Sequence, residues 1–464
     1  MVDHEGMVMR SLKILLPVHV FFPEHFYGTE TYTLELARQF IVRGHRPVVL
    51  TATPYGEKGS GKEYDYYEYD DVPVCRIDLN LKPHNRFKHT YYRQDLAALL
   101  KKIISEVGPD IAHVTHLINH SSALLEVLRD LNIPTIATLT DFFGICLNTK
   151  LERYDGRLCQ GPNRRSTNCL ACYFRAAGAL KLNNGIAKIL EKHSFILRLV
   201  TPAFYRLVQL PGFRQTVLAG HVGDVTSRPR ILHYLYGTYE KMIAPTDFLY
   251  EAYARNRFYP ERLKKINFGI TLDRVSAFAR QRKISDGNIK FGYIGQIARH
   301  KGVDLLVKAY SALKGNSGSL IIYGPFDQDY LYMKELRRLA LGRNRVEFRG
   351  TFPQEELGQR LSELDFLVIP SRWYENSPLV LLYALATKTP VIVTDVKGLS
   401  EFVTNDINGY TFKKDSSEHL HSIMQKIVND PVRVERLSEN AKYDKDVSDY
   451  AEEVLDIYRS VLTK

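Results

Sequence analysis

The sequence lacks the features that mark membrane-spanning and secreted proteins. In its 464 residues, no apolar run approaches the roughly 20 residues that a membrane-spanning helix needs. The first residues are too acidic and too mixed in character for a secretory signal peptide. No internal repeat recurs with a period of roughly 20–50 residues, which argues against a solenoid. We therefore expect a cytoplasmic protein.

The net charge of +11 is compatible with nucleic acid, a membrane surface or anionic small substrates as partners. The sequence has no arginine-rich arm, zinc-finger spacing or RNP-like aromatic motif, so no nucleic-acid partner is expected. Over residues 195–213, basic residues alternate with Leu, Phe, Tyr and Val, which suits contact with the inner, anionic face of a membrane. Pro202 and Pro211 are expected to break any single long helix there, and solvated basic loops are the alternative interpretation.

The composition is that of an ordinary globular protein, with 45% hydrophobic and 25% charged residues. Because single hydrophobic cores stop growing well below this length, we expect two domains. A polar linker at about 277–288 marks the boundary between them. The predicted divisions are an N-terminal domain over 1–280, a C-terminal domain over 288–446 and a last segment over 447–464.

The first half of the chain alternates strands and helices, which predicts a parallel α/β sheet. The predicted strands are 13–18, 47–51, 109–116, 134–139, 241–246 and 265–270, and the predicted helices are 29–43, 94–107 and 121–131. Gly44 is expected to end the first of these helices. The tyrosine- and acid-rich span 64–71 is expected to be a solvated loop.

Polar residues follow three strands of this predicted sheet. They lie in the loop over residues 24–30, at His116, and at Thr140 and Asp141. Because the carboxyl ends of parallel strands meet at one edge of a sheet, we expect these residues to converge on one crevice.

The alternation breaks over about 142–230, which predicts an insertion in the N-terminal domain. Four of the five cysteines lie in its first part, at Cys146, Cys159, Cys169 and Cys172. The close pair Cys169 and Cys172 is the spacing that a tetrahedral metal site uses, and the two upstream cysteines complete a four-thiolate set. Disulfides are not expected in a cytosolic chain. Two interpretations stay open: a structural zinc site, or reduced thiols without a ligand.

The second half predicts a doubly wound α/β domain. Its predicted strands are 289–294, 319–323, 346–348, 366–369 and 390–394, and its predicted helices are 303–313, 330–341, 354–364 and 378–386. The segment 366–386 is its most informative part. A short buried strand is followed by a polar loop with the only tryptophan, Trp373, and with Glu375.

The helix after that loop is apolar nearly all round, so it should be buried against the sheet. Ser377 is expected to be its N-cap and Pro378 its first residue. A buried helix N-terminus at the carboxyl edge of a sheet offers free N–H groups and a partial positive charge, which predicts a phosphate site. On the other side, a glycine loop over 295–302 brings Gly295 close to a ligand and lets Arg299 and Lys301 reach phosphate oxygens.

These segments resemble the retaining GT-B glycosyltransferases of the large family 4 type, which includes sucrose and glycogen-synthase-like bacterial enzymes. The resemblance covers nearly the whole chain. It rests on the motifs at 28–30, 43–45, 109–116, 140–143 with the cysteines, 244–246, 268–270, 295–302, 323–325, 370–392 and 408–409. It implies two Rossmann-like doubly wound domains facing across a cleft, with the last helix crossing back to the first domain.

The resemblance also implies roles for individual residues. Lys301, Glu375 and Asp141 match the catalytic positions. The donor-binding positions are Gly295, Gln296, Arg299, Lys301, Gly324, Pro325, Glu375, Asn376, Ser377, Leu379, Val380 and Tyr383, and the acceptor-binding positions are Gly28, Thr29, Glu30, His116, Thr140 and Asp141.

Three positions depart from the family's pattern. The usual second glutamate, eight residues after Glu375, is Tyr383. Losing that charged acceptor should weaken donor binding by roughly 1.5–3 kcal/mol. Gln296 stands where the family often has an arginine, and Thr140 stands where it often has a histidine.

The resemblance therefore predicts a retaining hexosyltransferase that moves a sugar from a nucleotide-diphosphate sugar to a glycan or lipid-linked glycan. Cations and a helix dipole directed at the departing phosphate would stabilise the transition state without a metal ion. The alternative is a non-catalytic relative that binds a sugar nucleotide or partners another glycosyltransferase.

Overall fold

A computed structural model of the chain describes residues 10–84, 86–181, 194–280, 288–314, 318–342 and 345–463. The chain forms two compact units, of which the first comprises residues 1–245, 249–266 and 451–464 and the second residues 246–248 and 267–450. The chain therefore passes into the second unit after residue 266, earlier than the linker expected at 277–288. Residues 281–287 of that linker lie outside the described part of the chain.

The first unit is built on an eight-stranded sheet with the strand order β3-β4-β2-β1-β5-β6-β7-β8. The strands are β1 (Lys13–Pro17), β2 (Arg46–Thr53), β3 (Tyr64–Tyr69), β4 (Val72–Asp78), β5 (Ile111–Val114), β6 (Thr135–Thr138), β7 (Lys241–Ala244) and β8 (Leu263–Lys265). All neighbouring strands pair in parallel except β3 and β4. The strand order reverses between β1 and β5, and ligands of open parallel sheets bind at such a point.

Strand β3 corrects one prediction, because the span 64–71 was expected to be a solvated loop. It pairs antiparallel with β4 across a two-residue turn, Asp70 and Asp71, whose φ angles are 54° and 61°. Two consecutive left-handed residues give the turn that matches the twist of a β-hairpin. The tyrosines favour a strand, and this propensity outweighs the acidic residues between them at the edge of the sheet.

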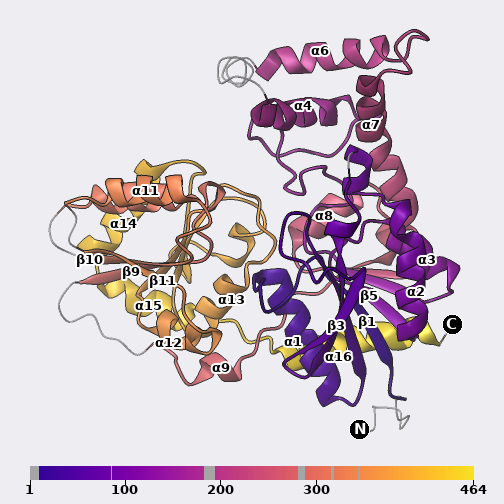
Figure 1. Cartoon of the computed structure of the whole chain (residues 1–464). Helices are drawn as coiled ribbons and strands as arrows, with labels where there is room; N and C mark the ends of the chain where they lie inside the picture. The colour runs from indigo at the N-terminus through magenta and orange to yellow at the C-terminus, as the bar shows by residue number, and fades with distance from the viewer. Residues whose placement is uncertain are drawn as a thin grey trace. The chain divides into compact units, whose positions relative to one another are not determined.

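Helices of the first unit include α1 (Gly28–Val42), α2 (Ala97–Val107) and α3 (Ala123–Asp130). Gly44 follows α1 with a φ of 77°, as expected of a helix C-terminus. Most of the last helix, α16 (Val447–Leu462), also belongs to this unit (Figure 1). The buried Tyr458 of α16 places its hydroxyl 2.9 Å from Nδ1 of His113 on β5. The C-terminus therefore completes the core of the unit with which the chain begins.

Between β6 and β7 the chain forms a helical insertion, α4 (Thr167–Lys181), α6 (Ser194–Leu207) and α7 (Val217–Tyr236) (Figure 1). These helices share a small core of their own, which contains Leu170, Val208, Val222 and Val225. Pro202 lies inside α6 and does not end it, contrary to the prediction, whereas Pro211 lies in the turn before α7. Pro202 is therefore accommodated within α6, although it lies beyond the first turn, where a proline is usually tolerated.

The second unit contains a six-stranded parallel sheet with the order β11-β10-β9-β12-β13-β14. The strands are β9 (Ile289–Ile294), β10 (Gly318–Tyr323), β11 (Val346–Gly350), β12 (Phe366–Ile369), β13 (Val391–Thr394) and β14 (Gly409–Phe412). The helices are α9 (Asp273–Ser276), α10 (Val303–Ser311), α11 (Tyr330–Leu339), α12 (Leu357–Ser362), α13 (Leu379–Ala386), α14 (Ser417–Asn429) and α15 (Val432–Asn440). The strand order reverses between β9 and β12.

Both units are thus Rossmann-like α/β folds, as the sequence predicts. Across the described residues, no helix is both long enough and apolar enough to cross a lipid bilayer.

Candidate functional site

The loops after β9 and β12 meet at the carboxyl edge of the second sheet, where its strand order reverses. The loop after β9 carries Lys301 and the loop after β12 carries Glu375. Their side chains form an ion pair, with Nζ of Lys301 2.7 Å from Oε1 of Glu375. The two residues that the sequence places closest to the reaction therefore lie together in the structure.

Backbone contacts hold these two loops against each other. The N–H of Arg372 donates to the carbonyl of His300 at 2.8 Å. The rings of His300 and Trp373 stack with centroids 3.7 Å apart. Gly302 has a φ of 69°, and a Cβ there would lie 2.0 Å from the carbonyl oxygen of Pro370. Only glycine fits at this position, because any side chain would both strain the backbone and separate the loops.

Opposing effects set the charge of Glu375. Burial raises the pKa of this carboxyl, but the Lys301 ammonium, the Ser371 hydroxyl and His300 together hold the pKa below its ordinary value. Ser371 donates to the same oxygen as Lys301, at 2.7 Å. The side chain of Glu375 is 13% exposed and that of Lys301 is 23% exposed. Glu375 is therefore ionised at neutral pH, and both side chains still reach solvent.

The helix after this loop begins differently from the prediction. Ser377 is not its N-cap: the cap is Pro378, no side chain caps the helix, and α13 begins at Leu379. Ser377 instead takes a left-handed backbone angle, with a φ of 56°. Its hydroxyl is buried and has no hydrogen-bond partner among the described residues. A buried hydroxyl without a partner, beside the unsatisfied N–H groups of a helix N-terminus, is an arrangement suited to an anion.

The other predicted donor residues fall into two groups. Residues of the first group line the loop ends: Gly295, Gln296, Gly324, Pro325, Asn376, Leu379 and Val380 lie at the carboxyl ends of β9 and β10 and at the start of α13. The second group, Arg299 and Tyr383, has partners elsewhere in the second unit. Arg299 pairs with Glu335 on α11 at 2.9 Å. Tyr383 is 3% exposed, and its hydroxyl accepts the N–H of Thr271 at 3.4 Å.

A second ion pair in this region was not found from the sequence. Arg372 makes two hydrogen bonds to Asp304, at 2.7 and 3.0 Å, and so ties the polar loop to the first turn of α10. Burial raises the pKa of Asp304, but Arg372, Tyr332 and Lys308 lower it by more, so that the carboxyl is ionised throughout the neutral range. The signal in the sequence that could have indicated this ion pair was the presence of Arg372 in the polar loop, next to Trp373.

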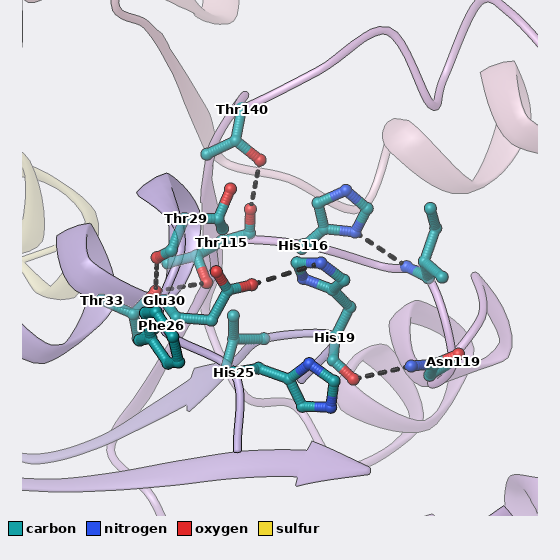
Figure 2. Close-up of polar contacts among 12 residues, drawn as sticks. His19, His25, Phe26, Thr29, Glu30, Thr33, Thr115, His116, Asn119 and Thr140 are labelled. Atoms are coloured by element: carbon teal, nitrogen blue, oxygen red, sulfur yellow. Dashed lines mark hydrogen bonds and ion pairs between the residues drawn. The ribbon is translucent and has the colours of Figure 1, made fainter. Parts of the chain in front are cut away.

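In the first unit, polar side chains gather at the carboxyl ends of β1, β5 and β6 (Figure 2). Nε2 of His19 lies 3.3 Å from Oε1 of Glu30. The His19 ring lies against the His116 ring, with centroids 4.3 Å apart. Nε2 of His116 in turn lies 3.0 Å from Oδ2 of Asp141. The predicted residues Glu30, His116 and Asp141 thus converge, linked by a histidine that the sequence analysis overlooked.

The hydrogen bonds of His116 fix its tautomer. The N–H of Ile118 donates to Nδ1 at 3.0 Å, so the ring proton is on Nε2 and is donated to Asp141. The other oxygen of Asp141 accepts the N–H of Phe143 at 2.8 Å. The Asp141 side chain is 20% exposed, so its carboxylate is oriented by two donors while remaining accessible.

Burial shifts the pKa of three groups in and beside this cluster. Burial and the neighbouring His116, His120 and His25 hold the pKa of His19 well below its ordinary value. Burial lowers the pKa of His120 to about 4. It raises the pKa of Glu30, whose side chain is almost fully buried.

The remaining acceptor-side residues frame this cluster. Thr140 donates to the carbonyl of Thr115 at 2.8 Å, and the carbonyl of Thr29 accepts from Thr33 at 2.8 Å. Gly28 is exposed at the start of α1. His19 lies two residues after the end of β1, and its position after a strand was the signal that could have found it.

The four cysteines of the insertion line a single cavity of about 370 Å³. All are free thiols. Among the described residues, no three His, Cys, Asp or Glu side chains are arranged to hold a metal ion, so the predicted zinc site at Cys146, Cys159, Cys169 and Cys172 is not supported. Burial raises the pKa of all four thiols, that of Cys172 to about 12. Cys169 and Cys172 lie on α4, Cys146 and Cys159 lie in the segment before it, and all four line the cavity.

Two family models match the sequence. The model described as "Glycosyl transferases group 1" matches residues 276–444, and the one described as "Glycosyltransferase Family 4" matches residues 26–164. The first contains the Lys301–Glu375 pair, and the second contains Glu30, His116 and Asp141.

Individual relatives agree with these models. The chain is 31% identical over 181 residues to a glycogen synthase of Marinomonas, which covers 37% of this chain and 37% of that protein. It is 22% identical over 404 residues to an uncharacterised 42.6 kDa protein in the cps region of Klebsiella pneumoniae, which covers 84% of this chain and 87% of that protein. The matches to several of the curated relatives span less than half of those proteins' own lengths.

The fold has close counterparts among solved structures. The crystal structure of Anabaena HepE in complex with UDP and glucose matches with a TM-score of 0.62 at 16% sequence identity. The match covers 97% of this chain and 100% of that one. At this level of identity the likeness establishes the fold.

Proposed function

Because the chain belongs to the group 1 glycosyltransferases of family 4 and has the GT-B fold, we propose that it transfers a hexose from a nucleotide-diphosphate sugar. The transfer retains the anomeric configuration, needs no catalytic metal ion, and has a glycan or lipid-linked glycan as its acceptor. The observation that carries this proposal is the Lys301–Glu375 pair, which stands beside the N-terminus of α13 at the reversal point of a parallel sheet.

The donor's diphosphate is the group that this arrangement suits best. Lys301 supplies a cation, the first turn of α13 supplies N–H groups, and the Ser377 hydroxyl supplies a buried polar group without a partner. In the reaction, the bond between the sugar C1 and the phosphate oxygen breaks, and the electron pair stays on the phosphate. Groups held rigidly at that phosphate stabilise the negative charge as it develops.

Glu375 has a different role, which is to hold the donor sugar. Its carboxylate is ionised and accepts hydrogen bonds from Lys301 and Ser371 on one oxygen. Its second oxygen is suited to accept from sugar hydroxyls. Charge-assisted hydrogen bonds of this kind are stronger than neutral ones and fix the position of C1.

On the acceptor side, we assign Asp141 to orient the incoming hydroxyl. His116 and the N–H of Phe143 hold this carboxylate in place, and it remains partly exposed. The acceptor oxygen forms the new bond to C1 on the face that the phosphate leaves, and its proton passes to the departing phosphate. The Klebsiella relative from the cps region and a capsular polysaccharide biosynthesis relative support a polysaccharide or its lipid-linked precursor as the acceptor class.

One observation favours a second candidate, a non-catalytic relative that binds a sugar nucleotide. Tyr383 stands where the family's second glutamate is usual, and its hydroxyl is engaged by the N–H of Thr271. Gln296 lacks the charge of the usual arginine. Both changes weaken the hold on the donor while leaving the Lys301–Glu375 pair in place.

The test is a panel of UDP-, ADP- and GDP-sugars, in which both binding and release of the nucleoside diphosphate are measured. The same measurements are made on the variants Lys301→Met and Glu375→Gln. Lys334→Met and Glu355→Gln, at exposed positions of the same unit, are the matched controls. Loss of a rigid donor to the developing charge lowers kcat by about 100- to 1,000-fold. We expect that loss for Lys301→Met and no change for either control.

The outcomes separate the two candidates. Release of nucleoside diphosphate that depends on Lys301 supports the transferase. Binding without release of product by the wild-type chain, for every sugar in the panel, supports the non-catalytic relative. Turnover that is the same in Lys301→Met and the wild type would refute the assigned role of the pair.

A further inference from the structure

The turn that joins α6 to α7 exposes an unusual number of large apolar side chains. Residues 209–218 are all exposed. The large apolar side chains exposed in this run are Leu210 (52%), Phe213 (44%), Val217 (80%) and Leu218 (45%), and Leu207 (41%) at the end of α6 joins them. Single exposed apolar residues are normal on a protein surface, but a continuous group of this size marks an interaction site.

These side chains also share a regular local geometry. Three successive turns close through hydrogen bonds from the N–H groups of Leu210, Phe213 and Thr216 to the carbonyls of Leu207, Leu210 and Phe213, at 3.1, 2.9 and 3.1 Å. A spacing of three residues places Leu207, Leu210 and Phe213 along one side of the turn. We call the five apolar residues together the apolar tip.

The apolar tip is separate from the small core that holds the insertion together. That core contains Val208, Val222 and Val225, with Phe204 and Tyr205 packed against it. Figure 1 shows α4, α6 and the first part of α7 beside one another, away from the strands of their unit. The tip is therefore the outer surface of a folded element rather than part of an unfinished core.

The part of the sequence that contains the tip is strongly basic. Residues 156–223 contain seven arginines and three lysines but a single acidic residue, Glu191. Their net charge of +9 accounts for most of the +11 of the whole chain. Arg206 and Arg214 are exposed next to tip residues in the sequence. A partner must therefore accept apolar side chains and carry negative charge nearby.

We propose that the apolar tip, with Arg206 and Arg214, docks the chain on the surface of an anionic phospholipid bilayer. A bilayer offers both features, because an acyl boundary receives Leu, Phe and Val just below a layer of phosphate groups. A second copy of the chain would bring positive charge against positive charge. A nucleic acid would satisfy the arginines and leave the apolar residues in water. This inference does not depend on the transfer reaction.

The test is flotation of the full chain with vesicles of phosphatidylcholine alone and of phosphatidylcholine with 30% phosphatidylglycerol, on the order of the anionic content at which surface charge attracts basic segments. We expect binding to the anionic vesicles only. The double variant Leu210→Ser/Phe213→Ser should bind at least about 10-fold more weakly, and so should Arg206→Gln/Arg214→Gln, because each basic residue near the surface contributes on the order of a fivefold gain.

Matched controls lie in the second unit. Leu331→Ser/Leu341→Ser removes two apolar residues that are 71% and 75% exposed, and Arg338→Gln/Arg436→Gln removes two exposed charges. Neither should change vesicle binding. Equal binding to neutral and anionic vesicles, or undiminished binding by either tip variant, would overturn the proposal.

A spectroscopic measurement separates insertion from electrostatic adsorption. The chain has one tryptophan, Trp373, in the second unit, so a second one can be read against a constant background. Emission from Phe213→Trp should shift to shorter wavelength on addition of anionic vesicles, whereas emission from Leu331→Trp should not. Vesicle binding without that shift at Phe213→Trp would also overturn the proposal, and dimerisation or RNA binding through the tip in place of vesicle binding would do the same.

Discussion

Lowering the pH from 7 to 5 should weaken the first unit far more than the second, because the first unit buries neutral histidines. Burial lowers the pKa of His113 to about 3 and that of His120 to about 4, from an ordinary value of 6.5. At pH 5 the unfolded chain binds a proton at each of these positions and the folded chain does not. Stability therefore falls as the pH falls below 6.5.

The size of the effect follows from these values. At pH 5 each histidine costs the folded state about 2 kcal/mol relative to pH 7, so the two together cost about 4 kcal/mol. His19, whose pKa is also lowered, adds to this loss. Glu30 opposes it, because a carboxyl with a raised pKa takes up its proton more readily in the folded state. A loss near 4 kcal/mol is a large share of the 5–15 kcal/mol, roughly, that stabilises a typical domain.

The second unit provides the internal reference. Asp304 and Glu375 have lowered pKa values, so their contribution to stability is complete above the ordinary pKa of a carboxyl and is lost only at more acidic pH. They do not titrate between pH 7 and 5.

Amide hydrogen exchange, corrected for the intrinsic effect of pH, measures the two units in one sample. The free energy of opening should fall by about 4 kcal/mol at pH 5 for the amides of β5 and α16, and should change little for those of β9. The variant His113→Asn cannot bind this proton, so its pH dependence should be smaller by about 2 kcal/mol. An equal loss in both units, or an unchanged pH dependence in His113→Asn, would refute the reasoning.

Three further predictions concern single interactions. Asp304→Asn removes the buried carboxylate that accepts two hydrogen bonds from Arg372 and leaves it only the exposed Asp415, so it should lower the free energy of unfolding in urea by about 2–3 kcal/mol. Gly398→Ala places a methyl group 1.7 Å from the carbonyl oxygen of Glu375 at a φ of 85°, so it should reduce donor binding as well as cost at least about 2 kcal/mol of stability. At pH 8 the cysteine thiols should react with Ellman's reagent at least about 100-fold more slowly in the native protein than in guanidinium, because burial raises their pKa; fast native reaction would show the cavity to be open.

The sequence predicted the strand, loop and helix around Glu375 because their signals are local. The run from β12 through the polar loop to α13 contains a buried strand, helix-forming residues and a charged loop in direct succession. Parallel strands always point their carboxyl ends the same way, so Lys301 and Glu375 had to lie at one edge. That they form an ion pair depends on β9 and β12 being neighbours, which the resemblance to GT-B enzymes implied and periodicity alone did not.

The errors arose where tertiary contacts outweighed local preference. Ser377 has the residue type of an N-cap, but Pro378 takes the cap position and turns the Ser377 hydroxyl inward. Arg299 pairs with Glu335 and lies over the ring of Tyr332 on α11, contacts that the sequence did not predict, and its expected place at the phosphate stays a prediction. No pattern within a loop can reveal a partner that comes from another helix.

His19 was overlooked for a related reason: its partners come from other segments of the chain. A single histidine after a strand carries no pattern, and its importance appears only when Glu30 and His116 are seen around it. Burial then decides its charge, and burial depends on the whole fold.

The two clusters differ in a way that matches what each would bind. In the second unit, Lys301–Glu375 and Arg372–Asp304 are ion pairs whose carboxyl pKa values are lowered, so that cluster contains cations of the kind that suit a diphosphate. In the first unit, burial keeps His19 and His120 neutral and raises the pKa of Glu30. Neutral histidines beside carboxyl groups favour an uncharged ligand that carries hydroxyl groups, because an anion would lose its hydration there without gaining a counter-ion. The proposed function assigns the phosphate-bearing donor to the second unit and the hydroxyl-bearing acceptor to the first, and the charges of the two clusters agree with that assignment.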